Sequence, residues 1–467
     1  MNRPARKDVI GMCFVAGTLA TLFVHGSQER PEPDLPMEAD AGGSVTSDVS
    51  TQVTAFVDVR VLPMTGVGVL PNQTVLVEHG VVTEVGAAGA VNVPAEARVI
   101  EGDGRLLMPG LTDAHVHLPD AREDVLALFL ANGVTTVFNL QGDPRHIALR
   151  ERIRSGEVAG PNIVTAGPFL TELNVRSVAD AHRVVEEHLS EGYDLLKIHG
   201  RIPEAAYIAL VDAGRSAGMP VVGHAPRNLP FDAVLEHGQQ GVVHAEELIY
   251  THLADLNAER LPELARRIAQ ADVWVTPTMT TFQAISEQWA RPAGLEARLS
   301  RPEAAWLPPS LKREWSTSTT YSARRERGRV RIEAMNTFHD PIVSALAAAG
   351  VPLLAGTDAP IPGLVPGFSL HDELEELVGA GLSVEEALRT ATVNAGAFSV
   401  EVLGAPDAFG TVEPGVRADL ILVAGDPRAE LTLLRQPLGV MASGRWYARA
   451  ELDELLARSA DRPIADR

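Results

Sequence analysis

The sequence predicts an α/β protein whose central part is a (β/α)8 TIM barrel. Between residues 111 and 399, short apolar runs alternate with helical patterns, which is typical of βα units and a parallel sheet. Eight such runs can be counted over roughly 280 residues, a size that suits an eight-unit barrel. Both ends of the chain instead show short alternating segments separated by glycine and proline, which indicates antiparallel β structure.

The eight apolar runs are the expected barrel strands. In chain order they are GLTDAHVHL, GVTTVFNL, PNIVTAG, YDLLKIHG, MPVVGHA, GVVHAEEL, VWVTPTMTT and VPLLAGTDAP. Helix-like stretches such as SVADAHRVVEEHLSEG separate them. The longest separation, residues 282 to 345, predicts extra helices after the seventh strand, which form either part of a lid or a solvated helical face.

The β-patterned ends frame this central part. Residues 54 to 107 contain short alternating segments such as AFVDVRVL and TVLVEHGVVTEVG. The same alternating pattern returns near the C-terminus in GTVEPGVRADLILVAGDP and GVMASGRWYA. We therefore expect β-rich segments at residues 51–110 and 400–449, a barrel at 111–399 and a C-terminal tail at 450–467.

The N-terminus has the layout of an export signal. Arg3, Arg6 and Lys7 precede an apolar run from Val9 to Val24, and a polar stretch rich in proline, glycine and acidic residues follows to residue 50. We expect residues 1–50 to be a signal or membrane anchor plus a disordered linker, with the rest of the chain exported, periplasmic or anchored facing outward. An uncleaved anchor is favoured over a cleaved signal because no small-x-small cleavage site ends the run.

Charge and cysteine content exclude several function classes. The formal net charge is −21, which repels nucleic acid and anionic membrane surfaces and favours a small-molecule or dipeptide substrate. Cys13 is the single cysteine among 467 residues, so an intrachain disulfide and a cysteine-rich metal site are both excluded.

Residues of the metal-ligand type stand at the ends of five of the eight runs. His115 and His117 lie two apart, so in a strand they point to the same side. Lys197 lies inside an apolar strand, where a lone ammonium is costly unless it is paired or chemically altered. Three further ends carry His224, His244 and Asp358. Each residue alone is weak support, since most single histidines are structural, but together they predict a metal site at the barrel mouth.

The ordered set of motifs resembles the amidohydrolase superfamily, in its imidazolonepropionase- and prolidase-like branch with a binuclear metal centre. The resemblance covers residues 54 to 445 and includes LLMPGLTDAHVHL, LLKIHG, VVGHA, GVVHAEEL, AGTDAPIPG and GTVEPGVRADLILVAGDP. It implies that the segments before and after the barrel pair into one small β-sandwich domain. It also implies a hydrolase, and relatives often form homo-oligomers.

The resemblance further implies two divalent ions, expected to be zinc, and a metal-bridging hydroxide that cleaves a peptide or amide bond. His115, His117 and Asp358 would hold the more buried ion, and His224 and His244 the second. Lys197 would be carboxylated, as N6-carboxylysine, and bridge both ions. Asp358 would also act as the catalytic proton shuttle.

The implied substrate is a dipeptide or an N-acyl amino acid with a free carboxylate. Arg227, three residues after His224, is the nearest cation at the mouth, and Tyr250 could hydrogen-bond the carbonyl oxygen. For both residues an ordinary loop position remains the alternative. Imidazolonepropionase itself fits poorly, because it uses one metal ion and has no need of Lys197.

Three other functions stay open. A lactonase or esterase would use the same binuclear site. A cyclic deaminase is disfavoured because Ala225 and Pro226 follow His224 where such enzymes carry a glutamate. A non-catalytic binding relative would have lost ligands, but all six expected positions are filled.

Overall fold

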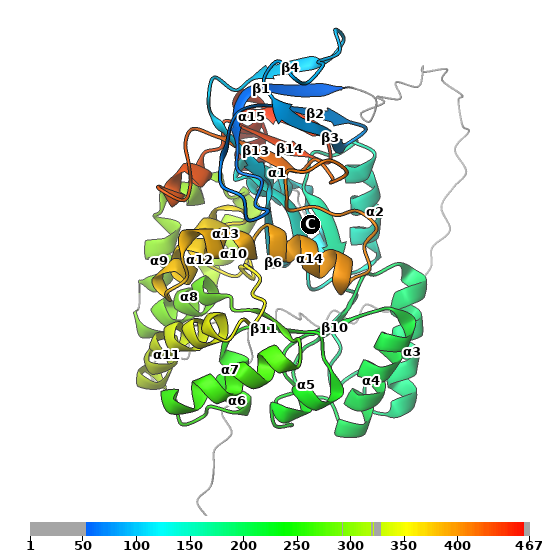
Figure 1. Ribbon diagram of the computed structural model, residues 1–467. Helices are drawn as coiled ribbons and strands as arrows, with labels where there is room; N and C mark the ends of the chain where they lie inside the picture. The colour runs from blue at the N-terminus through cyan, green and yellow to red at the C-terminus, as the bar shows by residue number, and fades with distance from the viewer. Residues whose placement is uncertain (1–52, 292, 319–320, 322–327, 462–467) are drawn as a thin grey trace, which may run out of the picture. The chain divides into compact units, whose positions relative to one another are not determined.

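The computed structural model describes residues 53–461 except residue 292 and the segments 319–320 and 322–327 (Figure 1). The expected export segment, with its candidate anchor from Val9 to Val24, lies outside the described residues. In the part of the chain that is described, no helix is both long and apolar enough to cross a membrane.

Two parallel sheets form the central part of the fold. One has the order β6-β7-β8 and the other β12-β11-β10-β9. Their strands are β6 (Leu111–Val116), β7 (Val134–Asn139), β8 (Asn162–Thr165), β9 (Leu196–Ile198), β10 (Val221–Gly223), β11 (Gly241–Val243) and β12 (Trp274–Thr276). Seven of the eight predicted apolar runs therefore contain a strand of a parallel sheet, which confirms the α/β class.

Isolated parallel bridges link the two sheets. Ala166 pairs with Leu195 between β8 and β9, and Val275 in β12 pairs with Leu353 in the eighth predicted run. A further bridge joins Ala359, near the end of that run, to Val116 in β6. The eighth run thus lies between β12 and β6 without forming a ladder, and a fully closed barrel stays a prediction.

The seventh run was expected to be a strand as far as Thr281, and this is wrong for its second half. The strand β12 ends at Thr276, and helix α8 (Met279–Ala290) begins three residues later. The reason is tertiary. Glu373 accepts hydrogen bonds from the backbone amides of Met279 and Thr280 at 3.1 and 2.8 Å, and so caps the start of α8.

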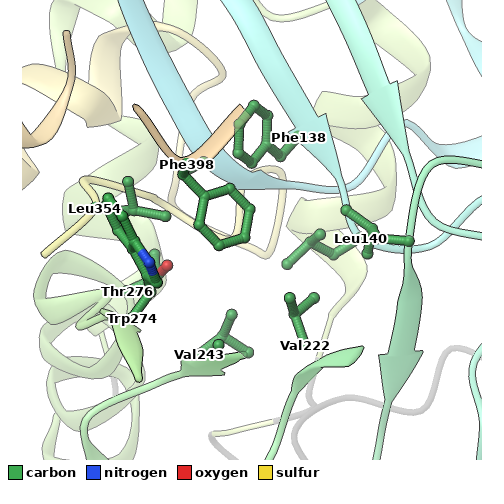
Figure 2. A pocket seen from close by; sticks show the side chains of 11 residues that line it. Phe138, Leu140, Val222, Val243, Trp274, Thr276, Leu354 and Phe398 are labelled. Atoms are coloured by element: carbon green, nitrogen blue, oxygen red, sulfur yellow. The ribbon is translucent and has the colours of Figure 1, made fainter. Parts of the chain in front are cut away.

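An apolar cavity lies between the two sheets (Figure 2). Phe138, Val222, Val243 and Leu354 from four different runs point toward it, and Phe398 from α14 joins them. The same side chains belong to one buried hydrophobic cluster. The core of the central part is therefore formed by side chains that converge from strands on both sheets, as in a barrel interior.

The β-patterned ends form one eight-stranded sheet, in which blue N-terminal and orange-red C-terminal strands lie side by side (Figure 1). In it, β13 pairs antiparallel with β5, with Leu420 opposite Pro109. Its strands are β1 (Thr54–Val61), β2 (Leu70–Glu78), β3 (Val81–Ala87), β4 (Arg98–Glu101), β5 (Leu106–Pro109), β13 (Leu420–Val423), β14 (Gly439–Ala442) and β15 (Arg445–Ala448). The pairing of the two ends is confirmed, and their arrangement as a sandwich stays a prediction.

Helices follow most central strands. They are α1 (Leu126–Ala131), α2 (Pro144–Arg154), α3 (Val178–Glu191), α4 (Glu204–Ala217), α5 (Asp232–His237), α6 (Glu246–Thr251), α7 (Leu261–Gln270), α8, α9 (Gly294–Leu299), α10 (Pro309–Thr317), α11 (Arg329–Ala348), α12 (Phe368–Gly379), α13 (Val384–Thr390), α14 (Val393–Glu401) and α15 (Arg449–Asp461). The extra helices expected in residues 282–345 are present as α9, α10 and most of α11. The expected C-terminal tail carries α15.

Candidate functional site

A polar layer continues directly from the apolar cavity along the same strands. Leu195 and Val222 line the cavity, and Lys197 and His224 follow two residues later. Residues two apart in a strand point to the same side, so the polar side chains stand above the apolar ones at the carboxyl ends of the strands. This is the location predicted for the site.

His115, His117 and Asp358 meet in this layer. One carboxylate oxygen of Asp358, Oδ1, lies 2.7 Å from His117 Nε2 and 3.3 Å from His115 Nε2. His115 is fully buried, and the side chain of His117 is 21% exposed, so the site opens on the His117 side. The predicted same-side orientation of the two histidines is therefore confirmed.

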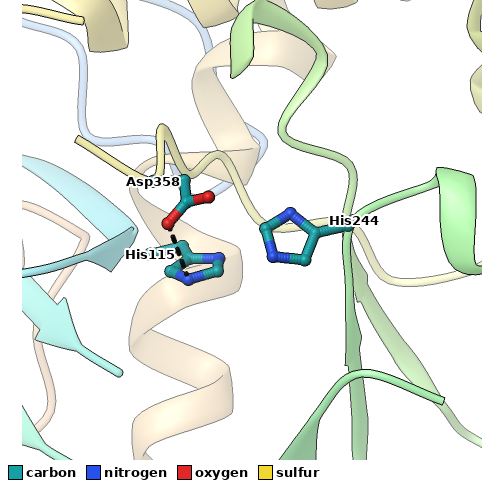
Figure 3. A group of neighbouring side chains, drawn as sticks. All are labelled: His115, His244 and Asp358. Carbon is teal, nitrogen blue, oxygen red and sulfur yellow. Dashed lines mark ion pairs between the residues drawn. The ribbon is translucent and has the colours of Figure 1, made fainter. Parts of the chain in front are cut away.

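His244 completes the tightest group of ligand-type atoms (Figure 3). One ligand atom each from His115, His244 and Asp358 lies within 4.8 Å of the others, and all three residues are buried. The rings of His224 and His244 have centroids 4.8 Å apart. The six predicted residues are thus brought together, although the tightest group combines His244 with residues that were expected to hold the other ion.

Hydrogen bonds fix the tautomers of His244 and His224. The Thr278 hydroxyl donates to the Pro277 carbonyl at 2.8 Å, so it must accept from His244 Nδ1, also at 2.8 Å. A carboxylate oxygen of Glu247 lies 2.7 Å from His224 Nδ1 and can only accept from it while ionised. In both rings Nε2 is left with its lone pair, which is the form that binds a metal ion.

Lys197 lies inside the same cluster. Its side chain is 1% exposed, and Nζ is 3.5 Å from His115 Nε2. Burial lowers the pKa of Lys197 to about 7, although the negative charges of Asp358 and Glu247 oppose the shift. A substantial fraction of this amine is therefore uncharged near neutral pH, as a nucleophilic amine must be.

Two histidines of the cluster, His115 and His224, are held neutral. Burial, reinforced by the positive charges of neighbouring groups, holds the pKa of His115 and His224 well below the usual value. For Asp358, burial would raise the pKa, but the hydrogen bond from His117 and the neighbouring basic groups, Lys197 among them, hold it below its usual value. Neutral imidazoles around an ionised carboxylate form a donor set that fits divalent cations.

The backbone is strained at three positions of the site. His244, Thr278 and Asp358 have φ angles of 73°, 51° and 55°, in the left-handed region that non-glycine residues rarely adopt. At His244 the strain ends the regular alternation of β11, so His244 can face the site although its neighbour Val243 lines the cavity. Such strain persists only where the surroundings enforce it, and it is concentrated at functional sites.

The two predicted substrate-binding residues lie beside the cluster. Arg227 forms an ion pair with Glu247, with Nη2 to Oε1 at 2.5 Å, and its guanidinium lies 4.6 Å from the centre of the Tyr250 ring. Arg227 is therefore already engaged with a carboxylate of this chain. Its role toward a substrate carboxylate, and that of Tyr250 toward a carbonyl, stay predictions.

Sequence reasoning missed several residues that support the site. Glu247 connects His224 to Arg227, and Thr278 orients His244. Asp113 accepts from the backbone amide and hydroxyl of Thr357 at 2.9 and 2.6 Å, and so ties β6 to the segment that carries Asp358. Burial raises the pKa of Asp113 to about 7. Two features of the sequence could have indicated them. Two adjacent glutamates follow His244 in HAEEL, and Asp113 lies two residues before His115, so in a strand it points to the same side.

Comparisons with known proteins agree with this geometry. The sequence profile of the Amidohydrolase family matches residues 106–447. An imidazolonepropionase of Rhizobium rhizogenes is 25% identical over 408 residues, which cover 82% of this chain and 94% of that protein. An adenine deaminase of Paracoccus denitrificans is 37% identical over 83 residues, but the match spans only 13% of its length and 17% of this chain.

A solved structure shares the fold. The structure described as a putative prolidase from Bifidobacterium longum superposes with a TM-score of 0.66 at 22% identity, covering 88% of this chain and 99% of that one. This likeness indicates that the α/β fold of the chain is TIM-barrel-like.

Proposed function

Since the chain belongs to the amidohydrolase family, in its imidazolonepropionase- and prolidase-like branch, we propose that it cleaves the amide bond of a dipeptide or an N-acyl amino acid. Membership of the family makes it a hydrolase of carbon–nitrogen bonds that depends on a metal. The substrate class and a binuclear zinc centre are what we add.

One observation carries the proposal. Six side chains from five strand ends, separated by up to 243 positions in the chain, converge on Asp358 and the rings around it. A structural role would not need five nitrogen ligands, four of them buried, around one carboxylate, because burying polar groups without full hydrogen bonding costs free energy. Hydrolysis with metal ions gives these residues a common purpose.

The ions would be held by His115, His117, His224, His244, Asp358 and a carboxylated Lys197. When bound, they would polarise the scissile carbonyl and supply hydroxide as a nucleophile near neutral pH. Lys197 contributes its uncharged amine, whose nitrogen forms a bond to the carbon of carbon dioxide and releases a proton. The resulting carbamate adds one negative charge, which offsets the positive charge of the ions in a site of low dielectric.

Asp358 transfers the proton. Its carboxylate is ionised and lies at the open side of the site beside His117, where it can accept a proton from the nucleophile and deliver it to the leaving amine. Glu247 and Thr278 hold the rings of His224 and His244 in the required tautomers throughout.

The proposal also includes a closed barrel, a composite β-sandwich domain and export of the protein. We infer that the isolated bridges close residues 111–399 into a complete barrel, and that residues 51–110 and 400–449 form one composite β-sandwich domain. Residues 1–50 direct export. Cell fractionation of the full chain, with and without residues 1–50, tests this, and a cytoplasmic full-length protein would contradict it.

A substrate screen tests the activity. The purified protein, loaded with zinc in bicarbonate buffer, should cleave dipeptides or N-acyl amino acids in preference to lactones, and elemental analysis should find about two metal ions per chain. Preferential lactone hydrolysis would instead establish the esterase alternative. Full activity in protein stripped of metal would refute the proposal altogether.

A further inference from the structure

Phe169 places an apolar ring against the open side of the ligand cluster. Its ring centroid lies 5.9 Å from that of His117, with the ring planes at 82°, and the ring stacks on His199 at 4.5 Å and 21°. His199 in turn meets His224 edge-on, with centroids 4.5 Å apart. His117, Phe169 and His199 are each partly exposed. These contacting rings therefore border one opening that solvent reaches, next to two of the predicted metal ligands.

The backbone around Phe169 contains one extra residue. The segment that follows β8 pairs twice with β9 and the residue before it, through the bridges of Ala166 with Leu195 and of Leu170 with Ile198. Leu170 follows Ala166 by four positions, whereas Ile198 follows Leu195 by three. An extra residue between two bridges, as in a β-bulge, redirects a side chain, and such irregularities are frequent beside active sites. Phe169 lies within this irregular stretch.

Hydrogen bonds hold the same stretch against the strand that carries Lys197. The backbone amide of Leu170 donates to the Lys197 carbonyl at 2.9 Å, and the amide of His199 donates to the Leu170 carbonyl, also at 2.9 Å. The side-chain amide of Asn174 donates to the carbonyl of Phe169 itself at 2.8 Å. The position of the ring is therefore fixed before any substrate binds, as is expected of a group that determines specificity.

The proposed chemistry has no use for Phe169, because a phenyl ring neither holds an ion nor transfers a proton. A polar substrate group placed against it would lose water without gaining a hydrogen bond. An apolar group would instead cover the ring and be stabilised by the hydrophobic effect. Resting on the amide-hydrolase function proposed above, we propose that Phe169, with His199 stacked behind it, forms an apolar wall of the substrate pocket and selects substrates with a bulky apolar side chain beside the scissile amide.

The apolar side chain can belong to either half of the substrate, and two series separate the halves. Phenylalanylglycine, leucylglycine and glycylglycine vary the acyl half, and N-acetylphenylalanine, N-acetylleucine and N-acetylglycine vary the leaving half. In the zinc-loaded wild type, kcat/KM should favour the phenylalanine and leucine members over the glycine member in at least one series. Phe169→Ala should lower that preference by about tenfold, because the contact with the ring is lost. Turnover of the glycine member should change little.

Three controls separate recognition from support of the cluster. Phe169→Leu keeps an apolar side chain and should retain most of the preference for the leucine member. Leu189→Ala truncates an apolar side chain that is 51% exposed on α3, and it should leave the preference as in the wild type. Zinc affinity, measured with a chromophoric chelator, should be the same in Phe169→Ala and the wild type. If Phe169→Ala lowers kcat/KM equally for all members of a series, or lowers none, the apolar wall is refuted.

Binding without turnover distinguishes a failure of the wall from a failure of the activity. With zinc bound, 3-phenylpropionate should raise the thermal unfolding midpoint of the wild type more than propionate does, and this difference should disappear in Phe169→Ala. A wild type that cleaves no amide yet shows the difference would overturn the proposed function and retain the wall. An active wild type whose preference for apolar members is absent, or is unchanged in Phe169→Ala, would overturn the wall alone. Neither cleavage nor a difference in midpoint would overturn both.

Discussion

Two layers of side chains on the same strands differ sharply in character. The lower layer, with Leu195, Val222 and Leu354 around the cavity, is apolar and packs in one buried cluster. The layer above it, with Lys197, His224 and Asp358, is polar, carries shifted pKa values and includes strained backbone. Only two residues along a strand, or four in the eighth run, separate them.

The difference teaches that stability and function are divided between neighbouring positions. Burial of the lower layer stabilises the fold by the hydrophobic effect. The upper layer removes ionisable groups from water, which costs free energy unless ions or hydrogen bonds compensate. Substitutions in the lower layer should therefore affect mainly folding, and substitutions in the upper layer mainly chemistry.

The largest effect is expected for Asp358→Asn. The amide cannot accept the proton, so kcat should fall by about 1,000-fold while the thermal midpoint in the absence of metal is retained or increased. Steady-state kinetics and thermal unfolding measure the two quantities. Asp407→Asn, at an exposed position, is the matched control. Turnover near the wild-type rate would remove Asp358 from proton transfer.

Leu195→Ala should break the lower layer instead. Truncating this buried side chain next to an existing cavity should lower the free energy of unfolding by about 3 kcal/mol. Urea unfolding gives that value, and Leu189→Ala, at a side chain that is 51% exposed, should cost far less. The division between layers fails if Leu195→Ala abolishes activity while the protein remains fully folded.

Lys197→Met tests the polar layer through the pH dependence of the unfolding free energy. The pKa of Lys197 falls from 10.5 unfolded to about 7 folded, so between these values the unfolded chain binds the extra proton. Stability contributed by the neutral amine is complete above pH 10.5 and is lost as the pH falls toward 7. In metal-free, carbon-dioxide-free buffer, the wild type should gain up to about 1.4 kcal/mol of unfolding free energy per pH unit in this window.

The Lys197→Met variant should lack this slope, because methionine does not titrate. Lys312→Met, at an exposed position of α10, should keep it. Urea unfolding at pH 7.5 and 9.5 decides the matter. Equal pH slopes in wild type and Lys197→Met would mean that the amine is not desolvated in the folded protein.

The smallest effect is expected for Thr278→Val. Loss of the hydroxyl leaves His244 Nδ1 without its acceptor, so affinity for zinc should fall by about tenfold. Competition with a chromophoric chelator measures that affinity. Thr278→Ser, which keeps the hydroxyl, should restore most of it. Unchanged affinity in the valine variant would show that the ring of His244 is oriented by packing alone.

Much of the fold could be predicted from local sequence patterns. The alternation of apolar runs and helical stretches located seven central strands, and the β-patterned ends indeed pair in one sheet. The failure at Met279 has a long-range cause, since the cap that starts α8 comes from Glu373, 94 residues away. Periodicity within a run contains no information about such a partner.

The candidate site divides in the same way. Residues two apart on strands, such as His115 and His117, could be placed on one side because strand geometry fixes their directions. Glu246 and Glu247 follow the strand as neighbours on a helical turn, and the sequence could not say which of them would contact His224. The positive φ angle of His244 was equally hidden, because no local residue type requires it.

The pairing of Leu420 with Pro109 also has a consequence for biosynthesis. Strand β5 leads directly into β6, yet its neighbour β13 is translated more than 300 residues later. On the ribosome, the first-made strands must therefore wait with an exposed edge until almost the whole polypeptide has emerged. A chain that stops before β13 would leave that edge open to pairing with other molecules.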